Sequence, residues 1–446
     1  MKQPAFKTYD VRGKVPQELN AELAENIAAA YAQVLEPSRV AVGYDVRLTS
    51  PELAAAVVQG LLKQGVDVYE LGMGGTEEVY HAAFAGQLDG GIMVTASHNP
   101  SEYNGMKFVA RHGAPLTADQ LGLIHQSLGH IRSSKRRGAT LHRDWRAQYL
   151  DYLADMFPPD SLARVKTVAN AGNGSIGPLL QQIVQRFDLD ARILLGEPDG
   201  TFPNGIPNPL LPEKRELTSQ AVVEHSAQLG VAWDGDFDRC FFWDDQGRFL
   251  ESYYLVGMFA RHFLKAGPAA ICYDPRLTWN TIEVVEQAGG TPLLCPTGHV
   301  FFKQNLRSNA AVYGGEMSGH HYFQRFGCCD SGVLPWLLWL QIQASQEQPI
   351  SAYIQERAQR FPASGEINRS VKDQKKVLQT IRQRYEKEVV QSWDLDGVSF
   401  DFAQWRFNLR SSNTEPLIRL NVESRGDEGL MHRKTQEILQ LVDECS

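Results

Sequence analysis

The fold is read most directly from Gly90-Gly-Ile-Met-Val-Thr-Ala-Ser-His-Asn-Pro100, in which an apolar run is followed at once by a polar loop. Residues 92–94 form a run that is too short for a helix, so they predict a buried strand. Pro100 blocks a simple continuation of regular structure. The Ser97 hydroxyl therefore follows the C-terminal end of a core strand, where open α/β sheets place their chemistry. Taken alone, the loop also suits an ordinary Ser-Asn-Pro turn.

Length and composition indicate a globular protein with several domains. The chain has 446 residues, of which 43% are hydrophobic and 22% charged, and its length gives room for about three domains. Residues 1–12 lack the apolar core of a signal peptide, and no apolar run is long enough to cross a bilayer. We therefore expect a cytoplasmic protein with no membrane partner, whose six cysteines are reduced thiols. The net charge of −8 argues against general nucleic-acid binding.

Strand and helix patterns alternate from the N-terminus onward. A strand over 39–44 is followed by a helix that Ser50-Pro51 opens, and a strand over 66–71 comes before the Ser97 loop. This alternation favours a mostly parallel sheet that is covered on both faces.

The same alternation of strands and helices recurs twice along the chain, near Val165 and near Ala269. The third round begins with Asp274-Pro-Arg276-Leu-Thr278, which echoes Asp45-Val-Arg47-Leu-Thr49 in the first. We therefore predict three related α/β domains with mixed, mostly parallel sheets, followed by a smaller C-terminal α+β domain, around a central cleft. The predicted boundaries are 1–145, 146–252, 253–364 and 365–446.

Asp234, Asp236 and Asp238 alternate after an apolar run, so an extended or gently turned segment would point all three carboxylates one way. Three carboxylates so near to one another repel unless a cation neutralises their charge. Oxygen ligands alone favour Mg²⁺ over zinc or copper. The alternative is a solvated acidic turn, but the preceding apolar strand and the following Arg239 favour a metal site.

Further polar loops follow later strands. Arg410-Ser-Ser-Asn-Thr414 offers a guanidinium, hydroxyls and an amide, which match the oxygens of a phosphate group. Thr297-Gly-His299 and Glu316-x-Ser318-x-His320 carry groups that can hydrogen-bond the hydroxyls of a carbohydrate. Each loop alone also suits an ordinary turn, and a lone His or Glu is usually structural.

The sequence resembles the α-D-phosphohexomutases, and within them the bacterial phosphomannomutases of GDP-mannose and polysaccharide pathways. The resemblance runs from about Phe6 to Glu423, and the family fold that it implies has four domains around a central cleft. The motifs that carry it are Thr95-Ala-Ser-His-Asn-Pro100, Asp234-Gly-Asp-Phe-Asp-Arg239, Gly315-Glu-Met-Ser-Gly-His320 and Arg410-Ser-Ser-Asn-Thr414.

The resemblance implies a phosphorylated Ser97 in the resting enzyme, Mg²⁺ as cofactor, and a hexose 1,6-bisphosphate as intermediate and activator. Phosphoryl transfer depends mainly on positioning and on neutralising oxygen charge, which a caged cation and Arg239 would supply. The implied metal ligands are an oxygen on phosphorylated Ser97 together with Asp234, Asp236 and Asp238.

The remaining site residues also follow from the resemblance. Lys107, with Arg12 beside it, would assist proton transfer at the attacking sugar hydroxyl, and His320 is a second candidate. Glu316 and Ser318 would hold sugar hydroxyls. Tyr9, His299 and Arg276 would line the site, and Arg410, Ser412, Asn413 and Thr414 would clamp the phosphate that does not react.

Two positions depart from the common pattern of the family: Phe237 replaces a frequent Gly, and Arg276 replaces a Lys found in some members. Both keep the needed chemistry, so they bear on substrate preference rather than on mechanism. Met317 stands where phosphoglucosamine mutases favour Gln, which weighs against that branch.

The function implied is the interconversion of mannose 6-phosphate and mannose 1-phosphate by a monomer or homodimer. A phosphoglucomutase or a dual-specificity phosphohexomutase is the alternative within the family, because mannose and glucose differ only at the C2 hydroxyl. Outside the family, a metal-dependent sugar phosphatase would share the aspartate loop. A serine hydrolase is disfavoured because Ser97 lacks a G-x-S-x-G setting. A sugar-phosphate sensor would have no reason to combine Ser97 with the acidic loop.

Overall fold

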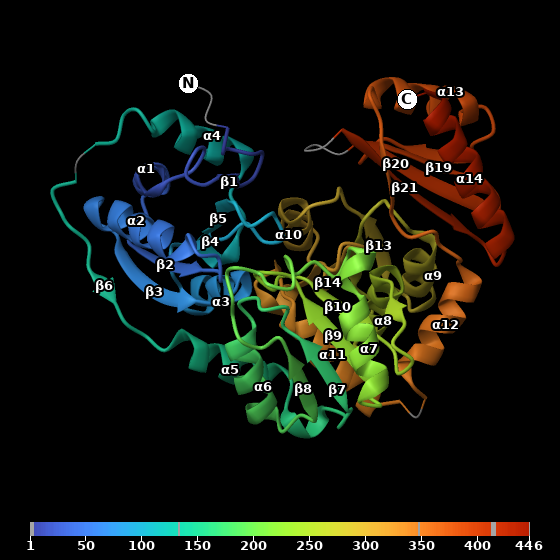
Figure 1. The fold of residues 1–446 in the computed structure, drawn as a ribbon, viewed down its shortest axis with the longest axis horizontal. Helices are drawn as coiled ribbons and strands as arrows, with labels where there is room; N and C mark the ends of the chain where they lie inside the picture. Colours follow the sequence, from blue (N-terminus) through green and yellow to red (C-terminus); the bar gives the residue numbers. More distant parts are fainter. Residues whose placement is uncertain (1–3, 133, 347, 412–415, 446) are drawn as a thin grey trace. The chain divides into compact units, whose positions relative to one another are not determined.

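The computed structural model of the protein describes residues 4–132, 134–346, 348–411 and 416–445. The chain divides into two compact units, whose elements are labelled in Figure 1. The first unit comprises Met1–Phe249 and Gly319–Glu347, and the second comprises Leu250–Ser318 and Gln348–Ser446, in each case as far as the residues are described. Within the described ranges, no helix combines the length and the apolar character that a membrane span requires.

The first unit contains a six-stranded sheet built around the strand that precedes Ser97. That strand, β4 (Gly90–Val94), pairs in parallel with β2 (Arg39–Tyr44) and antiparallel with β5 (Tyr103–Ala110). Every residue of β4 is buried, which explains why its sequence is uniformly apolar or glycine. The strand order is β1-β5-β4-β2-β3-β6, with β1 at Val11–Lys14, β3 at Asp67–Met73 and β6 at Thr140–Leu141.

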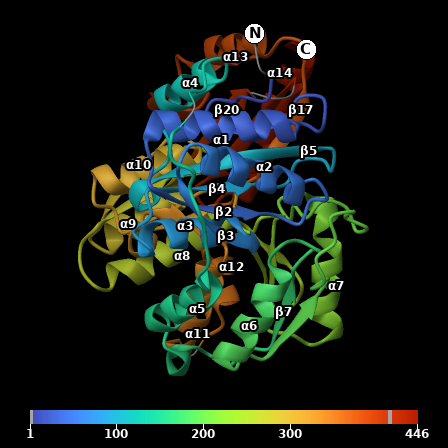
Figure 2. The ribbon, with the colours of Figure 1, turned by 90° about the vertical axis from the view of Figure 1, so that its left-hand side faces the viewer.

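Helices cover both faces of this sheet, as the alternation of patterns predicts. On one face, α1 (Ala21–Leu35) and α2 (Ser50–Lys63) lie side by side, as Figure 2 shows. The Asn20 side chain accepts a hydrogen bond from the Leu23 amide and so caps α1. On the other face lie α3 and α5, and α4 packs against α1. Their bounds are Thr76–Ala85 for α3, Ala118–Ser127 for α4 and Trp145–Met156 for α5.

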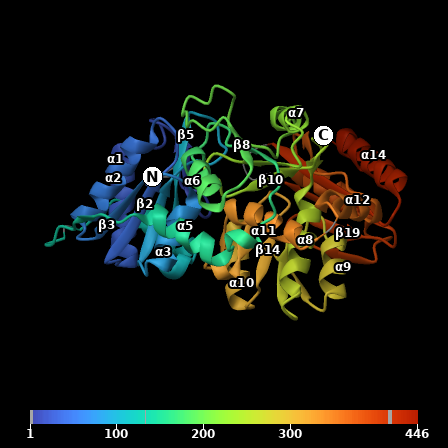
Figure 3. The same ribbon diagram turned by 90° about the horizontal axis from the view of Figure 1, so that it is seen from below.

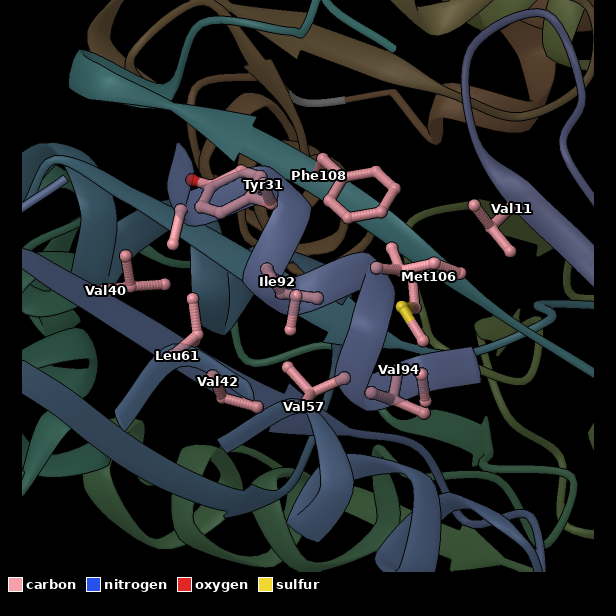
Figure 4. Close-up of a cluster of buried hydrophobic side chains, with 14 of the residues drawn as sticks. Val11, Tyr31, Val40, Val42, Val57, Leu61, Ile92, Val94, Met106 and Phe108 are labelled. Atoms are coloured by element: carbon pink, nitrogen blue, oxygen red, sulfur yellow. The ribbon is translucent and has the colours of Figure 1, made fainter. Parts of the chain in front are cut away.

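Alternate residues of the central strands divide the core between the two faces. Val40 and Val42 point toward α1 and α2, where they join Ile92 and Leu61 in the cluster of Figure 4. Ala41 packs in a separate cluster on the α3 and α5 side. Because successive strand residues face opposite ways, an unbroken apolar strand can serve two helical layers at once. Burying each valine or leucine side chain of this kind is worth about 1.5–3 kcal/mol.

A second sheet in the first unit carries the acidic loop. Its strand β9 (Leu229–Trp233) pairs in parallel with β7 (Thr167–Asn170) and antiparallel with β10 (Cys240–Trp243), so residues 234–239 connect a hairpin. The strand order is β11-β10-β9-β7-β8. The other elements are α6 (Gly177–Phe187), β8 (Ala191–Leu194), α7 (Glu216–Glu224) and β11 (Phe249–Leu250).

A later segment of the chain returns to the first unit and packs against α3. Phe326 contacts Phe84 edge to face, with ring centroids 5.2 Å apart. The Glu77 carboxylate accepts a hydrogen bond of 2.7 Å from the Gly332 amide, just before the first turn of α11. The elements of this segment are β15 (His321–Phe323), β16 (Cys329–Asp330) and α11 (Val333–Ala344).

The second unit begins with a third parallel arrangement. Strand β12 (Ala270–Tyr273) pairs in parallel with β13 (Thr291–Leu294) and with β14 (Tyr313–Gly315). Helices α8 (Ser252–Leu264) and α9 (Trp279–Gln287) pack against each other (Figure 3) and against β14 and β13 respectively. The remaining helices are α10 (His299–Ser308) and α12 (Ile350–Arg360).

The C-terminal part of the second unit has a different, antiparallel architecture. Helices α13 (Gln374–Tyr385) and α14 (Glu428–Cys445) share one hydrophobic core with its sheet. The strand order is β17-β21-β20-β19-β18, with bounds Ile367–Ser370, Leu417–Ser424, Trp405–Ser411, Val398–Asp401 and Gln391–Trp393 in that order. Short 3-10 turns lie in the first unit, at Arg111–Gly113, Pro159–Ser161, Pro212–Lys214 and Gln324–Phe326.

The predicted fold class, α/β modules with mixed sheets and a C-terminal α+β module, is confirmed. The domain boundaries and the central cleft stay predictions.

Candidate active site

Ser97 occupies a strained and buried position immediately after β4. Its φ of 50° lies in the left-handed region, which costs an L-residue about 1–2 kcal/mol. Its side chain is buried, and its amide donates a 2.8 Å hydrogen bond to Thr95 Oγ1. Thr95 Oγ1 in turn donates to Asp45 Oδ2 at 2.7 Å. Strain of this kind persists only where the surroundings over-determine the backbone, and it is concentrated at functional sites.

The three aspartates of the β9–β10 hairpin face Ser97. Ser97 Oγ donates a 2.9 Å hydrogen bond to Asp234 Oδ2. Asp234, Asp236 and Asp238 are buried, and one oxygen from each lies within 4.8 Å of the others. The sequence allowed an extended or gently turned segment here, and the structure has a turn in which the Phe237 amide donates to the Asp234 carbonyl at 3.2 Å.

Phe237 gives that turn its shape. It is fully buried and adopts a φ of 46°, which a glycine would reach without strain. Its ring lies against Gly75 at the start of α3, where an added Cβ would come within 2.2 Å of the ring carbons. Phe237 therefore anchors the acidic loop to α3, and Gly75 is the residue that leaves room for it.

The donor set of this loop fits a hard divalent cation. Asp236 Oδ1 is buried and has no hydrogen-bond partner in the part of the chain that the structure describes, and the buried Asp238 Oδ1 faces His320 Nε2 at 3.5 Å. Buried charged oxygens without partners are costly, and a bound cation removes that cost. A second group of side chains, Asp238 with His320 and Asp330, also brings one potential ligand atom each within 4.8 Å.

Lys107 lies on β5 and joins two of the three aspartates. Its Nζ donates to Asp236 Oδ2 at 2.6 Å and to Asp238 Oδ2 at 2.5 Å. Thr76 Oγ1 also donates to Asp236 Oδ2, at 2.6 Å. Burial disfavours the charged ammonium, but Asp236 and Asp238 outweigh this and raise the pKa of Lys107. The two carboxylates therefore favour the charged form of Lys107.

Arg239 and the histidines form the opposite wall of the Ser97 site. Arg239 Nη2 lies 2.9 Å from His98 Nδ1, and that nitrogen lies 3.0 Å from Ser97 Oγ. Arg239 Nε donates to His320 Nε2 at 3.3 Å. His320 Nε2 lies 3.5 Å from Asp238 Oδ1. A guanidinium and an imidazole thus stand beside both the hydroxyl and the acidic loop.

Arg12 reaches the Ser97 loop from β1. Its Nε donates to Asp10 Oδ2 at 2.8 Å, and its Nη1 donates to Asn99 Oδ1 at 2.7 Å. Tyr9 is half-buried in the turn that precedes β1. The structure therefore brings Arg12, Lys107, Arg239, His320 and Ser97 together with the three aspartates in the first unit.

Burial and neighbouring charges shift the pKa values of the aspartates in different directions. Burial is the main cause that raises the pKa of Asp234, and the neighbouring Asp238 and Asp236 add to it. Burial also acts to raise the pKa of Asp238, but Lys107 and His320 outweigh it and hold that pKa well below its usual range. A site that separates the pKa values of neighbouring carboxyl groups in this way is typical of functional clusters.

A second group of predicted residues lies in the second unit. Arg276 is buried and donates to Asp274 Oδ2 at 2.6 Å, and it lies 3.7 Å from Glu316. Arg410 donates to Glu366 Oε2 at 2.8 Å. Arg276 and Arg410 thus meet at Glu366, which lies 3.8 Å from Arg276, and Arg419 lies 3.5 Å from the same carboxylate. His299 begins α10, Ser318 is half-buried, and Ser412, Asn413 and Thr414 lie outside the described residues.

Comparisons with known proteins agree over the whole length. Four domain families match in order, described as phosphoglucomutase/phosphomannomutase alpha/beta/alpha domains I, II and III and the C-terminal domain, over residues 3–135, 147–247, 251–361 and 366–441. The chain belongs to the phosphoglucomutase/phosphomannomutase family. It is 48% identical to "Phosphohexose mutases" of Xanthomonas campestris, a match that covers 99% of this chain and 100% of that protein.

Other members of the family are similarly close in sequence or in fold. The phosphomannomutase of Escherichia coli strain K12 is 46% identical, over 99% of this chain and 100% of that protein. A solved structure of a phosphoglucomutase/phosphomannomutase family protein from Burkholderia thailandensis has a TM-score of 0.88 at 30% identity and covers 100% of this chain and 98% of that chain. The predicted family is therefore confirmed.

Several residues that surround the family's acidic loop in this chain escaped sequence reasoning. Asp10 and Asn99 accept hydrogen bonds from Arg12, and Thr76 donates one to Asp236. His98 stands between Ser97 and Arg239. His98 and Asn99 lie inside the Ser97 motif, so the motif itself was a usable signal. Thr76 opens a helix and carried no signal, because its contact with Asp236 joins residues far apart in the sequence.

Proposed function

We propose that the protein is a phosphomannomutase that interconverts mannose 6-phosphate and mannose 1-phosphate. Relatives named phosphomannomutase support this: those from Escherichia coli strain K12 and Vibrio cholerae are 46% and 44% identical over 99% and 98% of this chain. The observation that carries the chemistry is the 2.9 Å contact of Ser97 Oγ with Asp234, inside a buried cluster of three carboxylates and Lys107.

In the proposed cycle, a phosphorylated Ser97 donates its phosphoryl group to the free hydroxyl of the sugar phosphate. The bond between Ser97 Oγ and phosphorus breaks, and a bond between the sugar oxygen and phosphorus forms, which yields a hexose 1,6-bisphosphate. The bisphosphate then turns end for end, and its other phosphoryl group returns to Ser97. Each hydroxyl that attacks loses a proton, and each oxygen that leaves regains one.

The residues of the first unit suit these steps. Arg239 would neutralise the oxygens of the transferring group, and fixed charge of this kind is usually the largest catalytic contribution. Lys107 would assist proton transfer at the sugar hydroxyl with Arg12 beside it, and His320 is the second candidate. Asp234, Asp236, Asp238 and an oxygen on phosphorylated Ser97 would hold Mg²⁺, which supplies charge neutralisation for the phosphoryl group when bound.

The residues of the second unit suit recognition of the sugar phosphate. Glu316 and Ser318 would bind sugar hydroxyls, and His299 and Arg276 would line the site. Tyr9, a residue of the first unit, would line it as well. Arg410, with Ser412, Asn413 and Thr414, would clamp the phosphate that does not react, because guanidinium, hydroxyl and amide groups match phosphate oxygens. Because the bisphosphate reverses its orientation in the site, the same clamp has to accept a phosphate from either end of the sugar.

Replacing the nucleophile tests the proposed function. Ser97→Ala should abolish mutase turnover with mannose 1-phosphate and should prevent covalent phosphate from appearing in the intact mass after incubation with a hexose 1,6-bisphosphate. Ser101→Ala is the matched control, because Ser101 is exposed in the same loop, and it should keep both properties. Substantial mutase activity in Ser97→Ala would refute the role of Ser97.

Phosphoglucomutase or dual-specificity activity is the second candidate, because the family includes both activities by name. Mannose and glucose differ only at the C2 hydroxyl, so parallel kinetics with mannose 1-phosphate and glucose 1-phosphate decide between them. A metal-dependent sugar phosphatase would instead release inorganic phosphate in proportion to the substrate consumed.

A further inference from the structure

Arg47 lies behind the Ser97 loop and has no part in the site proposed above. It follows β2 and belongs to the Asp45-Val-Arg47-Leu-Thr49 sequence that recurs as Asp274-Pro-Arg276-Leu-Thr278. Its side chain is 1% exposed and is among the largest fully buried side chains of the described residues. A buried guanidinium has to be compensated, and its partners show what it does.

The guanidinium of Arg47 binds four backbone carbonyls of a single loop. Nη1 donates to the carbonyls of Pro100 at 2.8 Å and of Tyr103 at 2.9 Å. Nη2 donates to the carbonyls of Ser97 at 2.9 Å and of Asn99 at 2.6 Å. One rigid, planar group therefore spans the loop from its nucleophile to the first residue of β5.

Arg47 is itself held from two further directions. Its Nε lies 3.3 Å from Asp45 Oδ2, and the same carboxylate oxygen accepts the Thr95 hydroxyl that binds the Ser97 amide. The ring of Phe202, from the Pro- and Gly-rich loop that precedes α7, lies 5.5 Å from the guanidinium carbon. Asp45 and Arg47 thus fix the Ser97 peptide through both its amide and its carbonyl.

The repeated motif is used differently in the second unit. Arg276 holds the position that corresponds to Arg47, but its guanidinium pairs with the Asp274 carboxylate and lies near Glu316 and Glu366. The two arginines share a sequence pattern, and only Arg47 has its nitrogens directed at the carbonyls of the Ser97 loop.

We propose that Arg47 is a positioning residue that holds Ser97 in its strained conformation for phosphoryl transfer. This inference rests on the proposed function. Ser97 keeps a φ of 50°, and such a conformation persists only when the surroundings enforce it. In-line transfer depends on placing the nucleophile within fractions of an ångström, and a displacement of about 1 Å can lower the rate about a hundredfold. Releasing the four carbonyls removes that constraint without touching a reacting atom.

Arg47→Lys is the test variant, because lysine keeps a positive charge beside Asp45 but its point-like ammonium cannot span four carbonyls. Arg215→Lys is the matched control. Arg215 also donates to two loop carbonyls, those of Pro209 at 3.0 Å and Leu210 at 2.7 Å, and it stacks on Phe249. These two carbonyls belong to the segment before α7 and not to the Ser97 loop. Both variants are compared with the wild-type chain in full length.

Two readouts separate positioning from mere stability. In Arg47→Lys, hydrogen exchange at the amides of Ser97, Asn99 and Tyr103 should accelerate at least about tenfold, while Arg215→Lys leaves them unchanged. The kcat per phosphorylatable site should fall about a hundredfold with KM within about threefold. A purely structural role would lower the Tm and the active fraction and leave the kcat per active site and the loop exchange unchanged, and that result would overturn the proposal.

The outcomes also distinguish this proposal from the proposed function. If the wild-type chain lacks mutase activity, the function fails, and the exchange experiment still decides whether Arg47 holds the loop. If the wild type is active and Arg47→Lys matches it in kcat, the positioning role fails alone. Should Arg47→Lys not fold, Phe202→Leu loosens the same guanidinium from its ring side, and unchanged exchange of the loop amides in that variant would contradict the proposal.

Discussion

Single residues with unusual backbone angles define the candidate site. Ser97 and Phe237 both adopt positive φ, and they stand on the two loops that meet at Asp234. Neither angle is favoured by the residue that adopts it, so each is held by tertiary contacts rather than by local preference. The ring of Phe237 does this by packing on Gly75, at the start of the helix whose Thr76 binds Asp236.

Gly75→Ala tests this packing at the scale of one methyl group. The new Cβ would fall 2.2 Å from the buried Phe237 ring, and overpacking of this kind costs about 1–3 kcal/mol. We expect that loss in urea unfolding. The Mg²⁺ concentration for half-maximal activity should rise, because the acidic loop has to shift. Gly122→Ala in α4 has open space around it and should instead gain about 0.5–1 kcal/mol. An equal change in the free energy of unfolding of the two variants would contradict the packing of Phe237 on Gly75.

At the scale of elements, helix α3 connects the site to the segment that returns from later in the chain. Its N-terminal residues bind the acidic loop and the amide of Gly332, and its His81 and Phe84 pack among Tyr149, Tyr152 and Phe326. His81 is 2% exposed, and burial lowers the pKa of its imidazole to about 4. The helix therefore buries a neutral histidine in an aromatic cluster.

The contribution of His81 to stability should decrease in acid. Between pH 6.5 and about 4 the unfolded chain binds a proton on His81 that the folded chain does not, so the free energy of unfolding falls as the pH falls. From pH 7 to pH 5 the expected loss from this group is about 2 kcal/mol. His81→Phe should remove that part of the pH dependence, and urea unfolding of both proteins at the two pH values measures the difference. Identical pH slopes would rule out a buried neutral His81.

At the scale of the whole molecule, each compact unit carries one half of the predicted site. Within the second unit, a buried ion-pair network of the antiparallel part makes hydrogen bonds to the backbone of the parallel part. Arg406 donates to Asp401 at 2.7 Å and to Glu423 at 3.0 Å, and also to the carbonyl of Arg276 at 3.0 Å. Glu423 in turn accepts the amide of Thr278 at 2.7 Å. These bonds connect β20 and β21 to the loop that bears Arg276.

Removing one member of this network should destabilise the second unit strongly. Arg406→Met leaves two buried carboxylates without their cation, and breaking a buried pair in this way costs about 3–5 kcal/mol. Arg433→Met is the control, since Arg433 and Asp427 are exposed and 3.9 Å apart, and it should change the stability by less than about 1 kcal/mol. Thermal and urea unfolding measure both, and a loss below about 1 kcal/mol for Arg406→Met would contradict the role of the network.

The sequence by itself determined the elements and the chemistry of the loops. The buried strand before Ser97, the helix opened by Ser50 and the smaller C-terminal α+β module follow from local patterns of apolar residues and turns. Such patterns act over a few residues, so they can be read without the fold. The family followed from four motifs in the same way.

Only the tertiary structure decided which residues support those loops. The bonds of Arg47 to the Ser97 loop, of Thr76 to Asp236 and of Arg406 to the Arg276 carbonyl join positions separated by many residues. The turn at Phe237, where the sequence left an extended or a gently turned segment open, has its ring packed against Gly75. Long-range packing of this kind leaves no periodicity in the sequence, because its partners are chosen by the fold rather than by their neighbours along the chain.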